Sequence, residues 1–170
     1  MRAVEVLLDG FGRVHNAVHG AVHGLTESQL QERLDPDANT IAWLAWHLSR
    51  VQDDHIADVA GTEQVWSSGG WQQRFDLPFE QDETGYAQQS HDVAAVQASA
   101  PLLLDYYDTV HAQTISFVQG LRDEDLSRVV DTRWDPPVTL AVRLVSVISD
   151  DLQHAGQAAF IRGVVTRRAT

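Results

Sequence analysis

The sequence predicts an all-α protein, a four-helix bundle with a long aromatic-rich crossover between its second and third helices. Four segments, about 3–24, 40–60, 100–120 and 140–163, repeat apolar residues at spacings of three and four, as amphipathic helices do. The chain is also 44% apolar, with few glycines and prolines, which is typical of helical globular proteins. These observations together favour a bundle over a sheet or a disordered chain.

Length and composition narrow the classes of function. At 170 residues, 1–170 is most simply one domain. The absence of cysteine excludes disulfides and thiolate nucleophiles, and all 12 basic residues are arginines, so a lysine Schiff base is excluded as well. The net charge of −12 argues against nucleic acid as a partner. Neither a signal peptide nor a membrane span is expected, so we expect a cytoplasmic protein.

The first predicted helix, 3–24, has a plausible C-cap in Gly24. Its apolar stripe contains Val4, Leu7, Leu8, Phe11, Val14, Val18, Val22 and Leu25. His15, His19 and His23 follow one another at four-residue steps and drift from this stripe towards solvent, because each residue advances about 100°. His15 is expected near the edge of the core and His23 well outside it. Such a ladder can bind metal, but an exposed, solvated face is its commoner explanation.

A short helical corner, 25–30, and a loop, 35–40, lead into the second helix, 40–60. The apolar side of this helix contains Ile41, Leu44, Leu48, Val51, His55 and Val59. His47 is expected about a quarter turn from the centre of that side. His55 is expected to point at the core as a buried, hydrogen-bonded neutral imidazole.

Helical periodicity disappears between Gly61 and Ala98, apart from a possible short helix in 90–97. Loops of this length often cover or form a binding site. Trp66, Trp71 and Phe75 are expected to lie over one end of the bundle. They either cover a site or simply attach the loop to the core, and the sequence favours neither.

The second half of the chain repeats the organisation of the first. The third helix, 100–120, begins after the capping signal Ser99-Ala-Pro101, and the corner 120–126 (GLRDEDL) echoes 24–30 (GLTESQL). Each corner leads through a Pro-containing loop to a threonine, Thr40 or Thr139, that opens the next helix. The two halves suggest a bundle with pseudo-twofold character, in which the second and fourth helices can face each other.

The fourth helix, 140–163, carries the chemistry. Its apolar stripe contains Leu140, Leu144, Val147, Ala155, Ala158 and Val165. Asp150 and His154 fall at the edge of this stripe, one turn apart, and can share one metal ion if a third ligand comes from elsewhere. His47 is the best supplier of that ligand. The resulting set of two histidines and one carboxylate suits Zn²⁺, Ni²⁺, Fe²⁺ or Mn²⁺ and leaves positions open for water or substrate.

Other polar residues surround this predicted site. Asp151 projects closer to the core than Asp150 and could replace it as ligand or orient His154. Arg143 could pair with a carboxylate or anchor an anionic substrate, and Asp54 could orient a ligand. The plainer alternative for the whole constellation is a buried cluster of hydrogen-bonded polar groups without metal.

Three motifs resemble those of the DinB-like superfamily of metal-binding four-helix bundles, to which the N-terminal domain of the mycothiol-dependent maleylpyruvate isomerases is related. They are the corner at Gly24, the triplet 46–48 (WHL), and Asp150-x3-His154-Ala-Gly156-Gln157 followed by Arg162-Gly163. The resemblance covers nearly the whole chain. It departs from many members in having Asp150 where they have histidine, although the isomerase branch also has an acidic residue there.

The resemblance implies a divalent metal ion, zinc or nickel, held by His47, Asp150 and His154, a low-molecular-weight thiol such as mycothiol, and a homodimer. Our first hypothesis is therefore a metal-dependent thiol S-transferase or isomerase, acting on a small thiol and an electrophile. A non-catalytic module for metal or small ligands and a metal-free dimeric scaffold are the alternatives. The substrate, the thiol and the native metal are not specified by the sequence.

Overall fold

The computed structural model describes residues 2–168, and its fold is the predicted all-α bundle. Met1 and residues 169–170 of the predicted domain lie outside the described part. The helices are α1 (Ala3–Val22), α2 (Glu27–Gln31), α3 (Ile41–Ala60), α4 (Val65–Ser68), α5 (Trp71–Phe75), α6 (Ser90–Ala95), α7 (Ala100–Gln119), a 3₁₀ turn η1 (Asp123–Ser127) and α8 (Leu140–Arg168). In the described part of the chain, no helix is both long and apolar enough to span a membrane.

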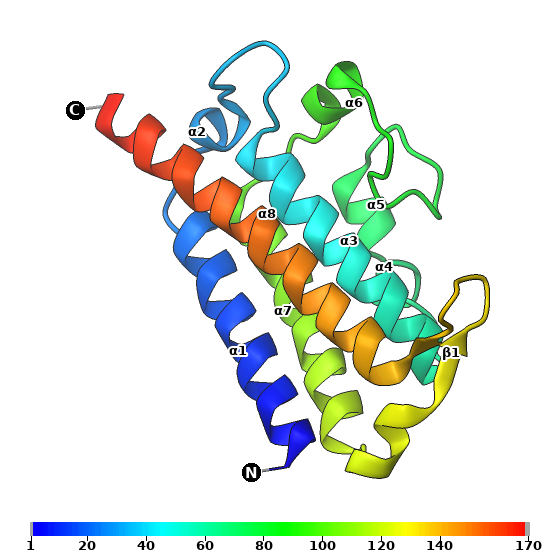
Figure 1. Ribbon diagram of the computed structural model, residues 1–170. Coiled ribbons are helices and arrows are strands. Elements are labelled where there is room, and N and C mark those ends of the chain that lie inside the picture. The colour runs from blue at the N-terminus through cyan, green and yellow to red at the C-terminus, as the bar shows by residue number, and fades with distance from the viewer. Residues whose placement is uncertain (1, 169–170) are drawn as a thin grey trace.

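The four long helices, α1, α3, α7 and α8, form the bundle (Figure 1). Both α1 and α3 pack against both α7 and α8, so α1 and α3 lie diagonally across the core. The prediction that the second and fourth helices face each other is therefore confirmed, because α3 and α8 share one of the main interfaces. The short helices α4, α5 and α6 and their loops lie beside α3 (Figure 1).

Helix ends follow local capping chemistry. The side-chain oxygens of Thr26, Thr40 and Ser99 accept hydrogen bonds from the third residue of α2, α3 and α7, respectively. Helix α1 ends at Val22 with His23 as its C-cap, and Gly24 follows at φ +77°, so this glycine is the residue after the cap rather than the cap itself. Helix α8 runs to Arg168, beyond the predicted end at residue 163.

A two-stranded antiparallel ribbon, β1 (Val129–Asp131) with β2 (Val138–Thr139), precedes α8 and pairs Val129 with Thr139 across an irregular register. The sequence predicted only a Pro-containing loop in this segment. Strands of two and three residues are too short to show an alternating pattern, which explains why they were not predicted.

Helix α3 is buried on all sides at its N-terminal half, where every residue from 41 to 50 is buried. A helix with this property lies inside the protein rather than on its surface. The predicted apolar side did not include Arg50 and Asp53, which are 0% and 2% exposed, respectively. It did include His55, whose side chain is 37% exposed, so the prediction that His55 points at the core is wrong. The crossover covers the other flank of α3, and this displaces the buried side away from His55.

Arg50 and Asp53 attach the crossover to α3. The Arg50 guanidinium donates hydrogen bonds to the Gln81 and Glu83 carbonyls and to Gln64, and its Nη1 lies 3.8 Å from Asp53. Asp53 accepts hydrogen bonds of 2.8 Å from the backbone N–H groups of residues 65 and 66 and one of 2.9 Å from the Tyr106 hydroxyl. These two side chains therefore anchor several parts of the crossover, and Tyr106 of α7, to one turn of α3.

The aromatic residues of the crossover also attach this segment to the core of the bundle. Trp66, Trp71 and Phe75 are buried, and their rings lie 5.3, 5.4 and 5.7 Å, respectively, from the ring of Tyr106 on α7. Of the two predicted roles, the structure favours attachment of the loop to the core. The possible short helix in 90–97 corresponds to α6.

We expect Asp53→Ala to lower the free energy of unfolding by about 3–5 kcal/mol, because it leaves Arg50 buried beside two unpaired backbone N–H groups. Tyr106→Phe removes only one partner of the same carboxylate and should cost about 1 kcal/mol. Urea denaturation of both variants and the wild type measures the difference. Equal, small losses in the two variants would contradict a central role for Asp53.

Candidate metal centre

The structure brings the three predicted ligands, His47 of α3 and Asp150 and His154 of α8, to one point. One donor atom from each of the three lies within 4.8 Å of the other two. The His47 and His154 rings are 4.9 Å apart, and Asp150 Oδ1 lies 3.7 Å from His154 Nε2. Packing of α3 on α8 therefore supplies the third donor that the i, i+4 pair on α8 lacked.

His47 is held in one tautomer and one orientation. Its Nδ1–H donates a hydrogen bond to the backbone carbonyl of Thr84, which leaves Nε2 as the nitrogen with a free lone pair. The Trp43 ring stacks on the imidazole at 4.6 Å and 15°. Burial lowers the pKa of His47, so the ring is neutral near pH 7, as a metal ligand must be.

His154 is oriented in the same way from its own helix. Its Nδ1 lies 3.2 Å from the side-chain oxygen of Gln157, to which it donates a hydrogen bond. Its Nε2 is consequently the nitrogen that faces Asp150. Gln157, which the sequence singled out only as part of the DinB-like motif, therefore has a physical role next to His154.

The carboxylate that joins the two histidines is Asp150 and not Asp151. Asp150 Oδ2 is buried without a hydrogen-bond partner among the described residues. Asp151 is 0% exposed, and neither of its oxygens has a hydrogen-bond partner there either. Burial and the neighbouring Asp150 charge raise the pKa of Asp151 well above its ordinary value, which favours a protonated carboxyl group. Gln157, rather than Asp151, hydrogen-bonds His154.

Gly85 allows the crossover to approach His47 closely. Its φ of +99° is unfavourable for residues with a side chain. A Cβ at this position would lie 2.6 Å from His47 Nδ1 and 3.2 Å from the Trp43 ring. The hydrogen bond from His47 to Thr84 therefore depends on the absence of a side chain at residue 85.

A cavity of about 390 Å³ opens next to the three donors. Its lining residues come from α3, the crossover and α8: His47, Val51, Asp54, His55, Thr84, Tyr86, Ser146, Val147 and Asp150. Two of the three donors, His47 and Asp150, thus form part of the cavity wall. A small molecule in the cavity would contact both donors and the hydroxyl and carboxylate groups around them.

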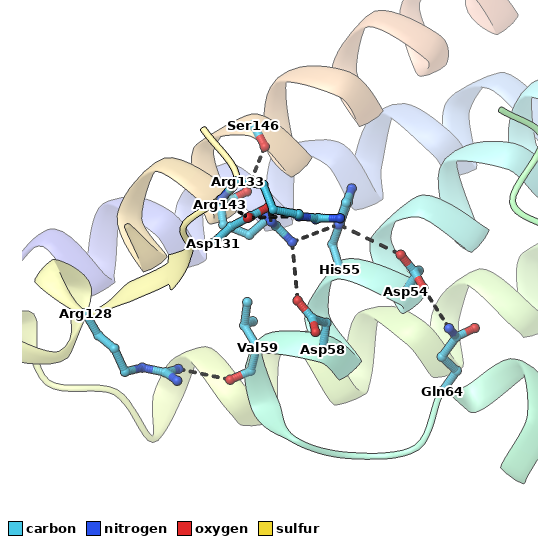
Figure 2. Close-up of polar contacts among 10 residues, drawn as sticks. All are labelled: Asp54, His55, Asp58, Val59, Gln64, Arg128, Asp131, Arg133, Arg143 and Ser146. Atoms are coloured by element: carbon cyan, nitrogen blue, oxygen red, sulfur yellow. Dashed lines mark hydrogen bonds and ion pairs between the residues drawn. The ribbon is translucent and has the colours of Figure 1, made fainter. Parts of the chain in front are cut away.

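A polar network lies beside this cavity (Figure 2). Arg143 donates hydrogen bonds to Asp131 at 3.3 Å, to Asp58 at 3.5 Å and to His55 Nδ1 at 3.1 Å. Arg133 also binds Asp131, through contacts of 3.0 and 2.8 Å. The predicted pairing of Arg143 with a carboxylate is therefore present, whereas its role as an anion anchor stays a prediction.

The network also fixes the state of His55. Burial and the nearby Arg143 charge lower the pKa of His55, so its imidazole is neutral near pH 7. Because Nδ1 accepts a hydrogen bond from Arg143, the proton of the neutral ring resides on Nε2. Asp54, the other predicted neighbour, accepts a hydrogen bond from Gln64 and lies 3.9 Å from His55.

The residues present fit a divalent metal ion. Both histidines have a hydrogen bond at Nδ1 and a free Nε2, the usual arrangement of histidine ligands. The unpartnered Asp150 Oδ2 is an oxygen donor at the same point. Two histidine nitrogens and one carboxylate are one of the donor sets found in open, catalytic metal sites.

Thr84 and Gly85 were not predicted to contribute to this site. They lie in a crossover without periodicity, and the backbone carbonyl of Thr84 contributes rather than its side chain. The only available signal was the glycine itself, in a segment that the sequence predicted either to cover a site or to attach to the core.

We expect Gly85→Ala to weaken divalent-metal binding by roughly 10- to 100-fold, because it displaces the carbonyl that orients His47. Gly61→Ala is the matched control, since Gly61 also has a positive φ, +68°, but no neighbouring atom within 4 Å of its Cβ position. Isothermal titration calorimetry with Zn²⁺ measures the zinc affinity of both variants. Equal zinc affinities for the two variants would show that the crossover does not orient His47.

Comparisons with known proteins agree with this architecture. A family model described as mycothiol-S-transferase matches residues 6–167. A conserved protein from Enterococcus faecalis has a similar structure, with a TM-score of 0.89, 32% sequence identity and coverage of 98% of each chain. A DinB-like protein from Bacillus cereus shares the fold, with a TM-score of 0.62, 20% identity and coverage of 97% of this chain and 91% of the other. No protein of curated function matches. The chain belongs to the mycothiol-S-transferase family, and the predicted DinB-like assignment is confirmed.

Proposed function

We propose that the chain is a metal-dependent S-transferase that joins a small thiol of the mycothiol type to an electrophile. The observation that carries the proposal is the convergence of His47, Asp150 and His154 next to a cavity of about 390 Å³, whose wall includes the first two of these residues. Membership of the mycothiol-S-transferase family supports the reaction class. The ligands proposed for zinc or nickel are these three residues.

The chain's own residues provide a preorganised set of donors. His47 is fixed by Thr84 and Trp43, and His154 is fixed by Gln157, so neither ring needs to reorient when an ion binds. When bound, a divalent ion would supply Lewis acidity that lowers the pKa of the thiol and favours the thiolate. Three protein ligands leave room for that sulfur.

The cavity lining supports a polar thiol without much negative charge. Asp54 and Asp150 contribute carboxylates, whereas Thr84, Tyr86 and Ser146 contribute hydroxyl groups. The net charge of the chain, −12, acts in the same direction. A hydroxyl-rich, neutral thiol is therefore favoured over a carboxylate-bearing thiol such as glutathione.

The homodimer implied by the family resemblance stays a prediction. Val142, Val145, Leu152 and Phe160 are exposed at 54%, 56%, 40% and 67%. At about 100° per residue these four side chains share one outward face of α8. This face is the surface that we propose for contact with a second copy.

The direct test follows thioether formation between mycothiol and monobromobimane, in which a C–S bond forms and bromide leaves. Zinc-loaded wild type should accelerate the reaction above its spontaneous rate, and chelation should abolish the acceleration. His154→Ala should abolish it too, since loss of a ligand should exceed the roughly 10- to 100-fold cost of losing an outer hydrogen bond. His91→Ala is the control, because the His91 side chain is 81% exposed and outside the site.

Two results would contradict the proposal. One is acceleration that survives chelation and the His154→Ala substitution. The other is stoichiometric zinc at the site with no acceleration for mycothiol or other thiols across several electrophiles, which would support the non-catalytic binding module. Faster reaction with glutathione than with mycothiol would contradict the inferred thiol class.

A further inference from the structure

A second group of metal-ligating side chains lies between α1 and α7, on helices that contribute none of the three donors described above. His15 and His19 come from α1, and Asp108 comes from α7. One donor atom of each lies within 4.8 Å of the other two. The sequence predicted a drift from His15 near the edge of the core to His23 well outside it, and in the structure His15 and His19 are half-buried whereas His23 is exposed.

Both imidazoles converge on the same carboxylate oxygen. His15 Nε2 lies 3.1 Å and His19 Nε2 lies 2.7 Å from Asp108 Oδ1, and the two rings are 4.4 Å apart. The i, i+4 spacing on α1 places both rings on one side of the helix. Donors bound to zinc at about 2.0–2.1 Å in a tetrahedral site are about 3.3 Å from one another. The two nitrogen–oxygen distances therefore need to lengthen by only about 0.2 and 0.6 Å to reach this donor spacing.

The contacts within the cluster leave two neighbouring polar groups without hydrogen-bond partners among the described residues. His111 Nδ1 and the Tyr107 hydroxyl are buried and have no hydrogen-bond partner in the described part of the chain. The His111 ring lies 4.6 Å and the Tyr107 ring 6.0 Å from the ring of His15. Both groups therefore lie beside the cluster with unused hydrogen-bonding capacity.

We propose that His15, His19 and Asp108 bind a second divalent transition-metal ion, with zinc as the best match to two imidazoles and one carboxylate. The ion takes the place of the protons in the two hydrogen bonds to Asp108. It links α1 to α7, since His15 and His19 lie 93 and 89 positions, respectively, before Asp108 in the sequence. The ligand side chains are 31–46% exposed, so the ion enters from solvent and keeps water in its remaining positions.

This proposal does not depend on the proposed S-transferase activity. A surface hollow next to the cluster includes His19, His23, Leu104 and Asp108, and it shares no lining residue with the cavity at the first site. The experiment therefore counts ions at each site separately and does not measure catalysis.

The test is zinc binding, measured by titration calorimetry and by metal analysis after desalting. Wild type should bind two zinc ions, and the double substitution His47→Ala with His154→Ala should retain one. Adding Asp108→Asn to that double variant should weaken the remaining site at least tenfold. In the same double variant, His15→Gln with His19→Gln should abolish the remaining site and remove the rise in melting temperature that zinc produces. His23→Gln is the matched control on α1 and should change neither quantity.

The outcomes separate the two sites. One zinc in wild type that is lost from the His15/His19 variant but kept by the His47/His154 variant supports the second site and contradicts the first. One zinc with the opposite pattern overturns the second site. A second zinc that survives both Asp108→Asn and the His15/His19 substitutions also overturns it. If the His47/His154 variant does not fold, the wild type is compared with the single variant Asp108→Asn. Two retained zinc ions in the wild type and one in the variant would then support the second site, and equal numbers would overturn it.

Discussion

The buried pair of Arg50 and Asp53 is the interaction on which the organisation of the structure depends. Arg50 is fully buried, so its guanidinium must be paired or hydrogen-bonded in several directions. Its partners are carbonyls and a side chain of the crossover, and those of Asp53 are the first backbone N–H groups of α4 and the hydroxyl of Tyr106. The cost of leaving either charge unpaired keeps a long irregular segment in one place against α3.

The position of the crossover in turn sets the chemistry of the first site. Arg50 binds the carbonyls of Gln81 and Glu83, and the next residue, Thr84, supplies the carbonyl that accepts the Nδ1–H of His47. Gly85 then allows the chain to pass the imidazole without a clash. A structural ion pair and a histidine tautomer are therefore connected by consecutive residues. The Nε2 that faces His154 and Asp150 is a consequence of this connection.

Much of the fold could be predicted from the sequence, because periodicity, capping residues and the repeated corner mark the four long helices. The three first-site donors could also be placed together, since i, i+4 spacing and the expected contact between two helices suffice.

The contributions of Thr84 and Gly85 could not be predicted, because backbone groups in an aperiodic loop have no sequence pattern. His55 was misplaced and Arg50 and Asp53 were overlooked for a related reason: a stripe of apolar residues does not reveal buried charges whose partners are loop backbone groups. The convergence of His15 and His19 on Asp108 could not be predicted either, because this partner comes from another helix.

Anomalous diffraction at the zinc edge, from crystals of the zinc-loaded protein, locates the bound ion relative to the three donors of the first site. We predict a zinc peak at about 2.0–2.2 Å from Nε2 of His47, Nε2 of His154 and an oxygen of Asp150, with Thr84 still bound to His47 Nδ1. A fully loaded crystal with no zinc between these residues would show that they do not form a metal site. Coordination through Nδ1 of His47 would show that Thr84 does not set the tautomer of this ligand.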